Sequence, residues 1–317
     1  MVKERLPLPP GGIAPNDVWW TEPEAGIQLR AALWQAQNPI GHVVFLTGRT
    51  EFLEKVAVPA AAFVQRGFSV LSWDWRGQGL SSRQASPALK GHVEDFAEFQ
   101  TDLDAILATE PARRLTGKRL IVAHSMGGCI AAQALARPKV VSTIDAAILC
   151  APMLGIAMHP VMRAAAAVAV RVWLLLGKGD SWPPFGDVKT PYVLTDPEDN
   201  VLTSDTSIMA WMAQVARDHP ESALAMPTLQ WFKAANDAMR AVKLHPAPSV
   251  PTLCLLGERE RVVDYEAVEA GARRMQARLE HLKYAQHELF IETEAIRTEV
   301  WRKIDAFLET HAFPIRN

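Results

Sequence analysis

The sequence has almost no net charge and no long basic run. Its 33 lysines and arginines nearly balance 35 aspartates and glutamates, which leaves a formal net charge of −2. Proteins that bind nucleic acid neutralise many phosphates with clustered basic side chains. The densest basic patch, RRLTGKR at residues 113–119, lies in a glycine-containing connection before a strand, where a solvated loop is the better interpretation. We therefore expect no nucleic-acid partner.

Cysteine is scarce, and no apolar run is long enough to cross a membrane. The three cysteines, Cys129, Cys150 and Cys254, lie in apolar segments without CxxC spacing, which favours a reduced compartment over a disulfide framework. The most apolar run, residues 161–177, contains two arginines and is shorter than the ~20 apolar residues of a spanning helix. The N-terminus has no apolar stretch of signal-peptide length. We expect a cytoplasmic protein without a transmembrane segment.

Common metal- and nucleotide-binding patterns are also missing. The chain contains no HExxH, no paired CxxC and no GxxxxGK[ST]. We therefore expect neither a metal nor an organic cofactor. With 317 residues, 49% of them hydrophobic, the chain can nevertheless bury a large core in one elaborated domain or in two closely joined ones.

What the sequence does contain is an alternation of short strand-like and helical segments. Strands are expected at residues 42–48, 68–74, 119–124, 146–152, 252–257 and 281–285, and helices at 51–66 and 93–110, from 126, from 264, and at 289–311. This alternation predicts a parallel sheet covered by helices on both faces. Residues 18–34 resemble an antiparallel hairpin, which would add edge strands. The predicted fold class is therefore α/β, with a mostly parallel central sheet.

The alternation is interrupted in the middle of the chain. Residues 155–245 lack the strand–helix rhythm and are predicted to be mostly helical. The simplest organisation is one α/β core domain formed by residues 1–154 and 246–317, split by a helical insertion at 155–245.

A serine stands where the predicted strand 119–124 passes into a helix. Ala123 and Gly127, two positions before and after Ser125, have the small side chains that a nucleophile elbow requires. The helix N-terminus behind the serine presents amides that favour a developing negative charge. The alternative is that Ser125 only caps the helix. Its place in the α/β alternation, with an acid and a histidine following in that order, favours the nucleophile.

Among the nine histidines, His287 has the position expected of a general base. It follows the last predicted strand and immediately precedes the final helix, at the C-terminal edge of the sheet. His124 adjoins the serine, but strand alternation turns it toward the sheet, which favours a packing role.

The acid partner of the base is expected in the loop GERERVVD, after the strand at 252–257. Spacing favours Glu260, and a glutamate can hold the imidazole tautomer as an aspartate does. Asp264 precedes a helical segment and is better explained as its N-cap. Glu258 is a weaker alternative.

An oxyanion hole needs a second amide besides the one after the nucleophile. The loop that follows the strand at 42–48 is suitable, because Thr47-Gly48 supply a turn and the backbone amide of Arg49 can then pair with that of Met126. The Arg49 amide would serve wherever its side chain points.

These motifs resemble the α/β-hydrolase superfamily, and within it the lysophospholipase and monoacylglycerol lipase group. The likeness covers most of the chain and rests on LTGRTEFLEK (46–55), DWRGQGLSS (74–82), AHSMGG (123–128), APML (151–154), GERERVVD (257–264) and HELFIE (287–292). In the insertion, NVLTSD (200–205), DHPE (218–221) and MPTLQW (226–231) are similar to the bacterial lysophospholipase branch.

The resemblance implies an α/β-hydrolase fold with a helical cap over the serine. It implies Ser125 as nucleophile, His287 as base and Glu260 as acid, at a position where the family most often has aspartate. The family's usual His-Gly before the oxyanion residue is Thr47-Gly48 here.

The activity implied by the resemblance is hydrolysis of an acyl ester, of a lysophospholipid or a monoacylglycerol. A carboxylesterase or acyltransferase acting on soluble esters and a non-catalytic ligand receptor on the same fold are the alternatives. Such lipid substrates are compatible with peripheral contact at the inner membrane face. The oligomeric state stays open.

Apolar side chains of the insertion are candidates for lining an acyl-chain pocket. For any single one of them, core packing is the simpler explanation, and the hypothesis applies to the group. The residues considered are Met158, Met162, Trp173, Leu174, Leu175, Leu176, Met209, Trp211 and Met212.

Overall fold

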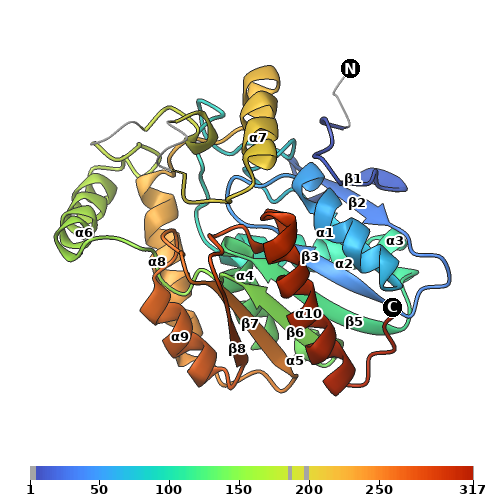
Figure 1. Cartoon of the computed structure of the whole chain (residues 1–317). Coiled ribbons are helices and arrows are strands. Elements are labelled where there is room, and N and C mark those ends of the chain that lie inside the picture. Colours follow the sequence, from blue (N-terminus) through green and yellow to red (C-terminus); the bar gives the residue numbers. More distant parts are fainter. Residues whose placement is uncertain (1–4, 185–187, 196–199, 317) are drawn as a thin grey trace.

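The computed structural model describes residues 5–184, 188–195 and 200–316. Its centre is an eight-stranded sheet in the order β1-β2-β4-β3-β5-β6-β7-β8 (Figure 1). The strands are β1 (Asp17–Glu24), β2 (Ile27–Trp34), β3 (Gly41–Leu46), β4 (Phe68–Trp73), β5 (Lys118–His124), β6 (Ala146–Cys150), β7 (Thr252–Gly257) and β8 (Arg278–Leu282). From β4 to β8 every neighbouring pair is parallel, and the β1–β2 hairpin adds an antiparallel edge. The mostly parallel sheet and the hairpin are confirmed.

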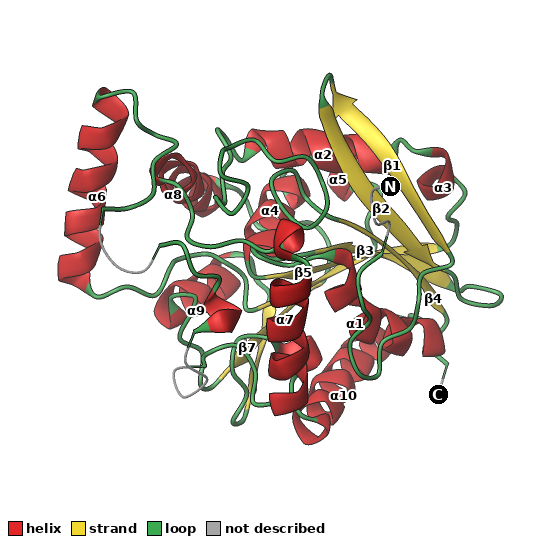
Figure 2. Ribbon diagram, turned by 90° about the horizontal axis from the view of Figure 1, so that it is seen from above, coloured by secondary structure: helices red, strands yellow, loops and turns green. Residues whose placement is uncertain are grey.

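Helices cover both faces of the sheet (Figure 2). Alternation along each strand separates the core into two layers, so that Val44 and Leu46 of β3 face one layer while Val43 and Phe45 face the other. Helices α1 (Leu53–Gln65) and α10 (Glu294–Thr310) pack on the second of these faces. The first face is covered by α2 (Ala97–Leu107), α3 (Glu110–Arg113), α4 (Met126–Leu135), α5 (Pro138–Val141), α8 (Leu229–Leu244) and α9 (Tyr265–Arg274).

The C-terminal elements differ from their predicted bounds. Strand β8 ends at Leu282, so His281 lies inside the strand and does not open it. The final helix begins at Glu294, after the short 3-10 helix η4 (Leu289–Ile291). The buried carboxylate of Glu292 accepts hydrogen bonds from the amides of Gln286 and Thr293, and these bonds stabilise an irregular loop where the sequence suggested a helix.

The insertion contains α6 (Pro160–Leu175), the 3-10 helices η1 (Tyr192–Leu194) and η3 (Pro220–Ser222), and α7 (Thr206–Asp218). Helix α8 was also predicted to belong to it, but its Trp231, Ala235 and Met239 are buried in the core layer that contains α4. We therefore propose that the cap ends before α8. Residues 185–187 and 196–199 of the predicted cap lie outside the described residues.

Helix α6 stands apart from the rest of the molecule in both views (Figures 1 and 2). It touches α8, and most of its surface is exposed. In the described part of the chain, no helix combines the length and the apolar character needed to cross a bilayer.

The motif DWRGQG forms a turn beside the C-terminal edge of the sheet and is held by buried charges. Asp74 pairs with Arg30 at 2.8 Å and accepts the backbone amides of Leu53 and Leu80. A Cβ atom on Gly79, whose φ is +52°, would lie 2.1 Å from Cγ of Asp74. This turn therefore requires glycine, and it fixes the start of α1 next to the site described below.

Candidate active site

Ser125 lies at a sharp turn between β5 and α4. Its φ of 51° and ψ of −118° are unusual for a residue with a side chain, and such strain persists only where surrounding contacts hold it. Its amide donates to the Cys150 carbonyl at 3.0 Å, and its carbonyl accepts from the amides of Gly128 and Met153, both at 2.8 Å. The side chain makes no helix-capping hydrogen bond, so capping does not explain the serine.

The two glycines after Met126 allow close backbone contact at the start of α4. A Cβ atom on Gly127 would lie 2.2 Å from the Leu46 carbonyl oxygen, at the end of β3. One on Gly128 would lie 2.5 Å from Cβ of Pro152. Neither position has room for a larger residue, which explains the small residue expected after the serine.

His287 and Glu260 form a buried pair. Nδ1 of His287 lies 2.7 Å from Oε2 of Glu260, while Oε1 accepts the amides of Val262 at 2.6 Å and Val263 at 3.0 Å. Burial alone would raise the pKa of Glu260, but His287 and these amides outweigh it and lower the pKa. The carboxylate is therefore ionised at neutral pH and oriented toward the imidazole.

The other two acidic candidates lie elsewhere. Asp264 is the N-cap of α9, since its Oδ1 accepts the Ala267 amide at 3.1 Å, and its Oδ2 pairs with Arg163 at 2.9 Å. The N-cap prediction is confirmed. Glu258 is exposed. Of the three, Glu260 is the one hydrogen-bonded to His287.

The loop after β3 lies directly against the serine. A Cβ atom on Gly48 would be 3.0 Å from Cβ of Ser125. The side chain of Gln78 supports this loop, because its amide donates to the Gly48 carbonyl at 3.1 Å and its oxygen accepts the Thr50 amide at 2.8 Å. Among the residues that the structure describes, the backbone amides of Arg49 and Met126 donate to no protein atom. Two neighbouring amides are thus available to an oxyanion.

His124 does not simply pack in the sheet, as its place in the strand suggested. Its Nδ1 lies 2.6 Å from Glu51, and its Nε2 lies 3.1 Å from the backbone carbonyl of His287. Burial would lower the pKa of His124, but Glu51 and Glu288 outweigh it and raise the pKa to about 9. The ring is therefore protonated at neutral pH and donates from both nitrogens, which connects the loop after β3 to the loop that carries His287.

Lys55 completes this buried network. Its ammonium group pairs with Glu288 at 2.7 Å and with Glu51 at 3.3 Å. Glu51, His124 and Glu288 also place potential metal-ligand atoms within 4.8 Å of one another. Lys55 and protonated His124 already neutralise both carboxylates, so these residues bind one another in place of a cation. This network was not predicted from the sequence. The charged residues Glu51, Lys55 and Glu288, which stand among apolar residues, were the signal for it.

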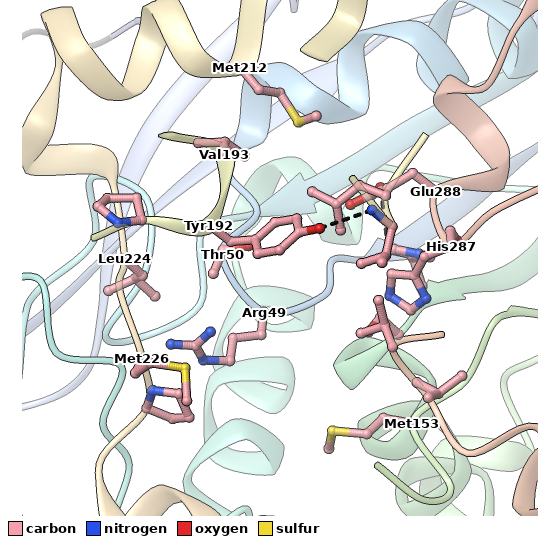
Figure 3. A pocket seen from close by; sticks show the side chains of 18 of the residues that line it. Arg49, Thr50, Met153, Tyr192, Val193, Met212, Leu224, Met226, His287 and Glu288 are labelled. Atoms are coloured by element: carbon pink, nitrogen blue, oxygen red, sulfur yellow. Dashed lines mark hydrogen bonds and ion pairs between the residues drawn. The ribbon is translucent and has the colours of Figure 1, made fainter. Parts of the chain in front are cut away.

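A cavity of about 410 Å³ opens above Ser125 and His287. Its walls are mostly apolar and come from both the core and the insertion (Figure 3). The insertion contributes, among others, Tyr192, Val193, Met212, Leu224 and Met226. The hydroxyl of Tyr192 accepts the Val201 amide at 2.9 Å.

The residues predicted to line an acyl pocket lie for the most part elsewhere. Of the nine, Met158 and Met212 line the cavity. Met162, Leu175 and Leu176 are exposed on or just after α6, because that helix stands away from the cavity. Residues of the insertion do line the cavity, but those of α6 do not, so the hypothesis was wrong about α6. That the cavity holds an acyl chain stays a prediction.

The sheet order, the serine at the strand–helix turn and the buried His–Glu pair define an α/β hydrolase. Two solved structures agree over nearly the whole chain. A soluble variant of the monoglyceride lipase from Saccharomyces cerevisiae has a TM-score of 0.72, with 17% identity over 95% of this chain and 97% of that one. A carboxyl esterase from Bacillus coagulans has a TM-score of 0.73, with 17% identity over 93% and 98%. The α/β-hydrolase fold is confirmed.

The chain belongs to the serine aminopeptidase S33 family, whose model matches residues 37–294. It is 30% identical over 273 residues to the probable lysophospholipase L2 of Haemophilus influenzae, covering 85% of this chain and 84% of that protein. It is also 30% identical over 333 residues to lysophospholipase L2 of Escherichia coli K12, covering 95% and 92%. The chain is thus a hydrolase of the lysophospholipase and monoacylglycerol lipase group, a class of carboxylic ester hydrolases.

Proposed function

We propose that this hydrolase cleaves the acyl ester of a single-chain glycerolipid, a lysophospholipid or a monoacylglycerol, with Ser125, His287 and Glu260 as its triad. The observation that carries the proposal is the mostly apolar cavity, which has Ser125 and the Glu260-bound His287 in its wall. Apolar pockets with a few convergent polar groups are typical of sites for substrates with long apolar parts. The names of the two bacterial relatives support the same substrate class.

The proposed reaction proceeds through an acyl-enzyme. Oγ of Ser125 attacks the acyl carbonyl while Nε2 of His287 takes its proton. Glu260 holds the proton on Nδ1 and stabilises the imidazolium that forms. The amides of Arg49 and Met126 donate to the oxyanion. His287 then protonates the leaving glycerol oxygen, and a water molecule, activated in the same way, releases the fatty acid.

The test is release of carboxylate from four substrates at equal concentration. These are a lauroyl lysophospholipid, the lauroyl ester of glycerol, the butyryl ester of glycerol and an aminoacyl anilide. Each buried methylene contributes about 0.8 kcal/mol, so kcat/KM is expected to rise at least ~10-fold from the butyryl to the lauroyl ester. Preference for the butyryl ester would indicate a carboxylesterase for soluble substrates, and preference for the anilide would indicate an aminopeptidase.

We also propose that α6 contacts the membrane surface where such substrates reside. Arg163 and Arg171 are its charged residues, so the helix carries no acidic side chain that anionic lipids would repel. Its exposed apolar side chains, together with the residue that follows the helix, are Val161, Met162, Val168, Val172, Leu175 and Leu176.

The substitution Leu175→Glu is expected to weaken binding to anionic vesicles about 10-fold, because burying a leucine contributes roughly 1.5–3 kcal/mol. Leu244→Glu is the matched control, since Leu244 at the end of α8 is 87% exposed and Leu175 is 88% exposed. Co-sedimentation with phosphatidylglycerol vesicles measures the binding. Equal weakening by both substitutions, or no effect of Leu175→Glu, would rule out a specific role for α6.

A further inference from the structure

The side chain of Arg49 lies in the cavity wall, and no described residue is its acidic partner. Nη2 donates to the Ala225 carbonyl, whereas the buried Nε has no hydrogen-bond partner among the described residues. The guanidinium carbon lies 5.6 Å from the ring centroid of Trp231. Figure 3 shows the guanidinium turned toward Met226, away from His287. Within the described ranges, no carboxylate forms an ion pair with Arg49.

Arg30 and Arg76, the two arginines that are almost completely buried in the described chain, are paired with acidic residues. Arg30 pairs with Glu54 and Asp74, and Arg76 pairs with Asp102 at 2.6 Å. A buried cation is costly unless it is paired. Burial lowers the pKa of Arg49 to about 9, no described acidic group opposes the change, and the side chain is still charged at neutral pH. In the part of the chain that the structure describes, the cavity therefore holds a positive charge with no carboxylate paired to it.

A second arginine lies in the same wall. Arg261 lines the cavity and donates from Nη2 to the Asn200 carbonyl at 3.2 Å. No ion pair is formed by Arg261 with any described residue either. Glu288 is the one acidic residue among the described lining residues, and Lys55 neutralises it. Counting the described lining residues, the charge left for a ligand is therefore positive, and it comes from two arginines.

We propose that Arg49, assisted by Arg261, binds the phosphate of a lysophospholipid headgroup, so that the enzyme prefers lysophospholipids to uncharged monoacylglycerols. This inference rests on the proposed ester hydrolysis. The backbone amide of Arg49 belongs to the proposed oxyanion hole. The guanidinium of the same residue is therefore one side-chain length away from the reacting carbonyl. In a lysophospholipid, the glycerol backbone separates the acyl ester from the phosphate over a similar stretch of bonds. One guanidinium group can bind two phosphate oxygens through two parallel N–H groups, and it is therefore more specific for phosphate than an ammonium group is.

The test compares two lipids that share a palmitoyl chain, lysophosphatidylglycerol and monopalmitoylglycerol, at equal mole fraction in micelles of an uncharged detergent. The readout is kcat/KM for lysophosphatidylglycerol divided by kcat/KM for monopalmitoylglycerol. An effect on the ester hydrolysis that both lipids share cancels in this ratio. Arg49→Gln removes a charge-assisted hydrogen bond to the phosphate, so it is expected to lower this ratio ~10-fold or more. Arg261→Gln is expected to lower it less, because its side chain is exposed. Arg113→Gln, on the exposed surface of α3, should leave the ratio unchanged.

A binding measurement tests the phosphate site without any turnover. Calorimetry with glycerophosphoglycerol is expected to show binding to the wild-type protein and at least 10-fold weaker binding to Arg49→Gln, with glycerol as the uncharged control. Equal loss of activity on both lipids in Arg49→Gln, with unchanged glycerophosphoglycerol binding, would overturn the inference. If the wild-type protein hydrolyses neither lipid but binds glycerophosphoglycerol through Arg49, the proposed function fails and the phosphate site stands.

Discussion

Ser125→Ala is expected to reduce ester hydrolysis by about 10⁴-fold or more, since the attacking oxygen is removed while the cavity and the two oxyanion amides remain. The fold should tolerate this change. Ser125 is 8% exposed and its side chain makes no capping hydrogen bond, and alanine keeps the Cβ atom that lies beside Gly48. The thermal midpoint of unfolding should therefore change little while the turnover is lost. His287→Ala should show a loss of the same size, because a triad acts as a unit.

A fluorophosphonate probe provides the direct measurement. It should form one adduct, at Ser125, in the wild-type protein and none in Ser125→Ala. Ser142→Ala is the matched control, because Ser142 is exposed at the end of α5 and should affect neither labelling nor turnover. An adduct on another serine would contradict the assignment. A wild-type protein that neither reacts nor hydrolyses would favour a ligand receptor on this fold.

Glu260→Gln is expected to lower kcat by about 10⁴-fold without unfolding the protein. The reason lies in how the carboxylate is held. Oε1 accepts the amides of Val262 and Val263, so the glutamine oxygen will occupy that position. The glutamine NH₂ group will then face Nδ1 of His287. Nδ1 must become the acceptor, the ring proton moves to Nε2, and Nε2 can no longer take the proton of Ser125.

The matched control for this substitution is Asp264→Asn, which also turns a loop carboxylate into an amide. Asparagine is as good an N-cap as aspartate, so α9 should remain stable and kcat should change little. Steady-state kinetics on one lysophospholipid compares the two variants directly. If Asp264→Asn were the variant that lost activity, Glu260 would not be the acid.

Whether the sequence predicted a part of this site depends on how far apart along the chain the residues that form it lie. The serine turn was predictable because small residues and a strand-to-helix change lie within a few positions of Ser125. Glu260 and His287 followed from their loops at the C-terminal ends of successive strands, since parallel strands bring those loops to one edge. The structure places this Glu–His pair 2.7 Å apart, in the wall of the cavity that contains Ser125.

The buried charges were not predictable in this way. Lys55 and Glu288 are 233 positions apart, and their contact depends on how α1 packs beside the loop after β8. His124 follows strand alternation, but the face it points to is polar at that end of the sheet because Glu51 lies there. Alternation predicts which side a residue faces, whereas its neighbours on that side come from distant segments.

By itself, the sequence determined the α/β alternation, the parallel sheet with its antiparallel edge and the strand-to-helix turn at Ser125, because periodicity and turn chemistry are local properties. Tertiary structure alone decided that α8 joins the core layer, that α6 stands away from the cavity, and that Arg49 faces it without an acidic partner among the described residues. Those features depend on which surfaces pack together and on which polar groups are left without a partner after packing. An unpaired polar group costs free energy when it is buried, and it is buried only in the folded chain.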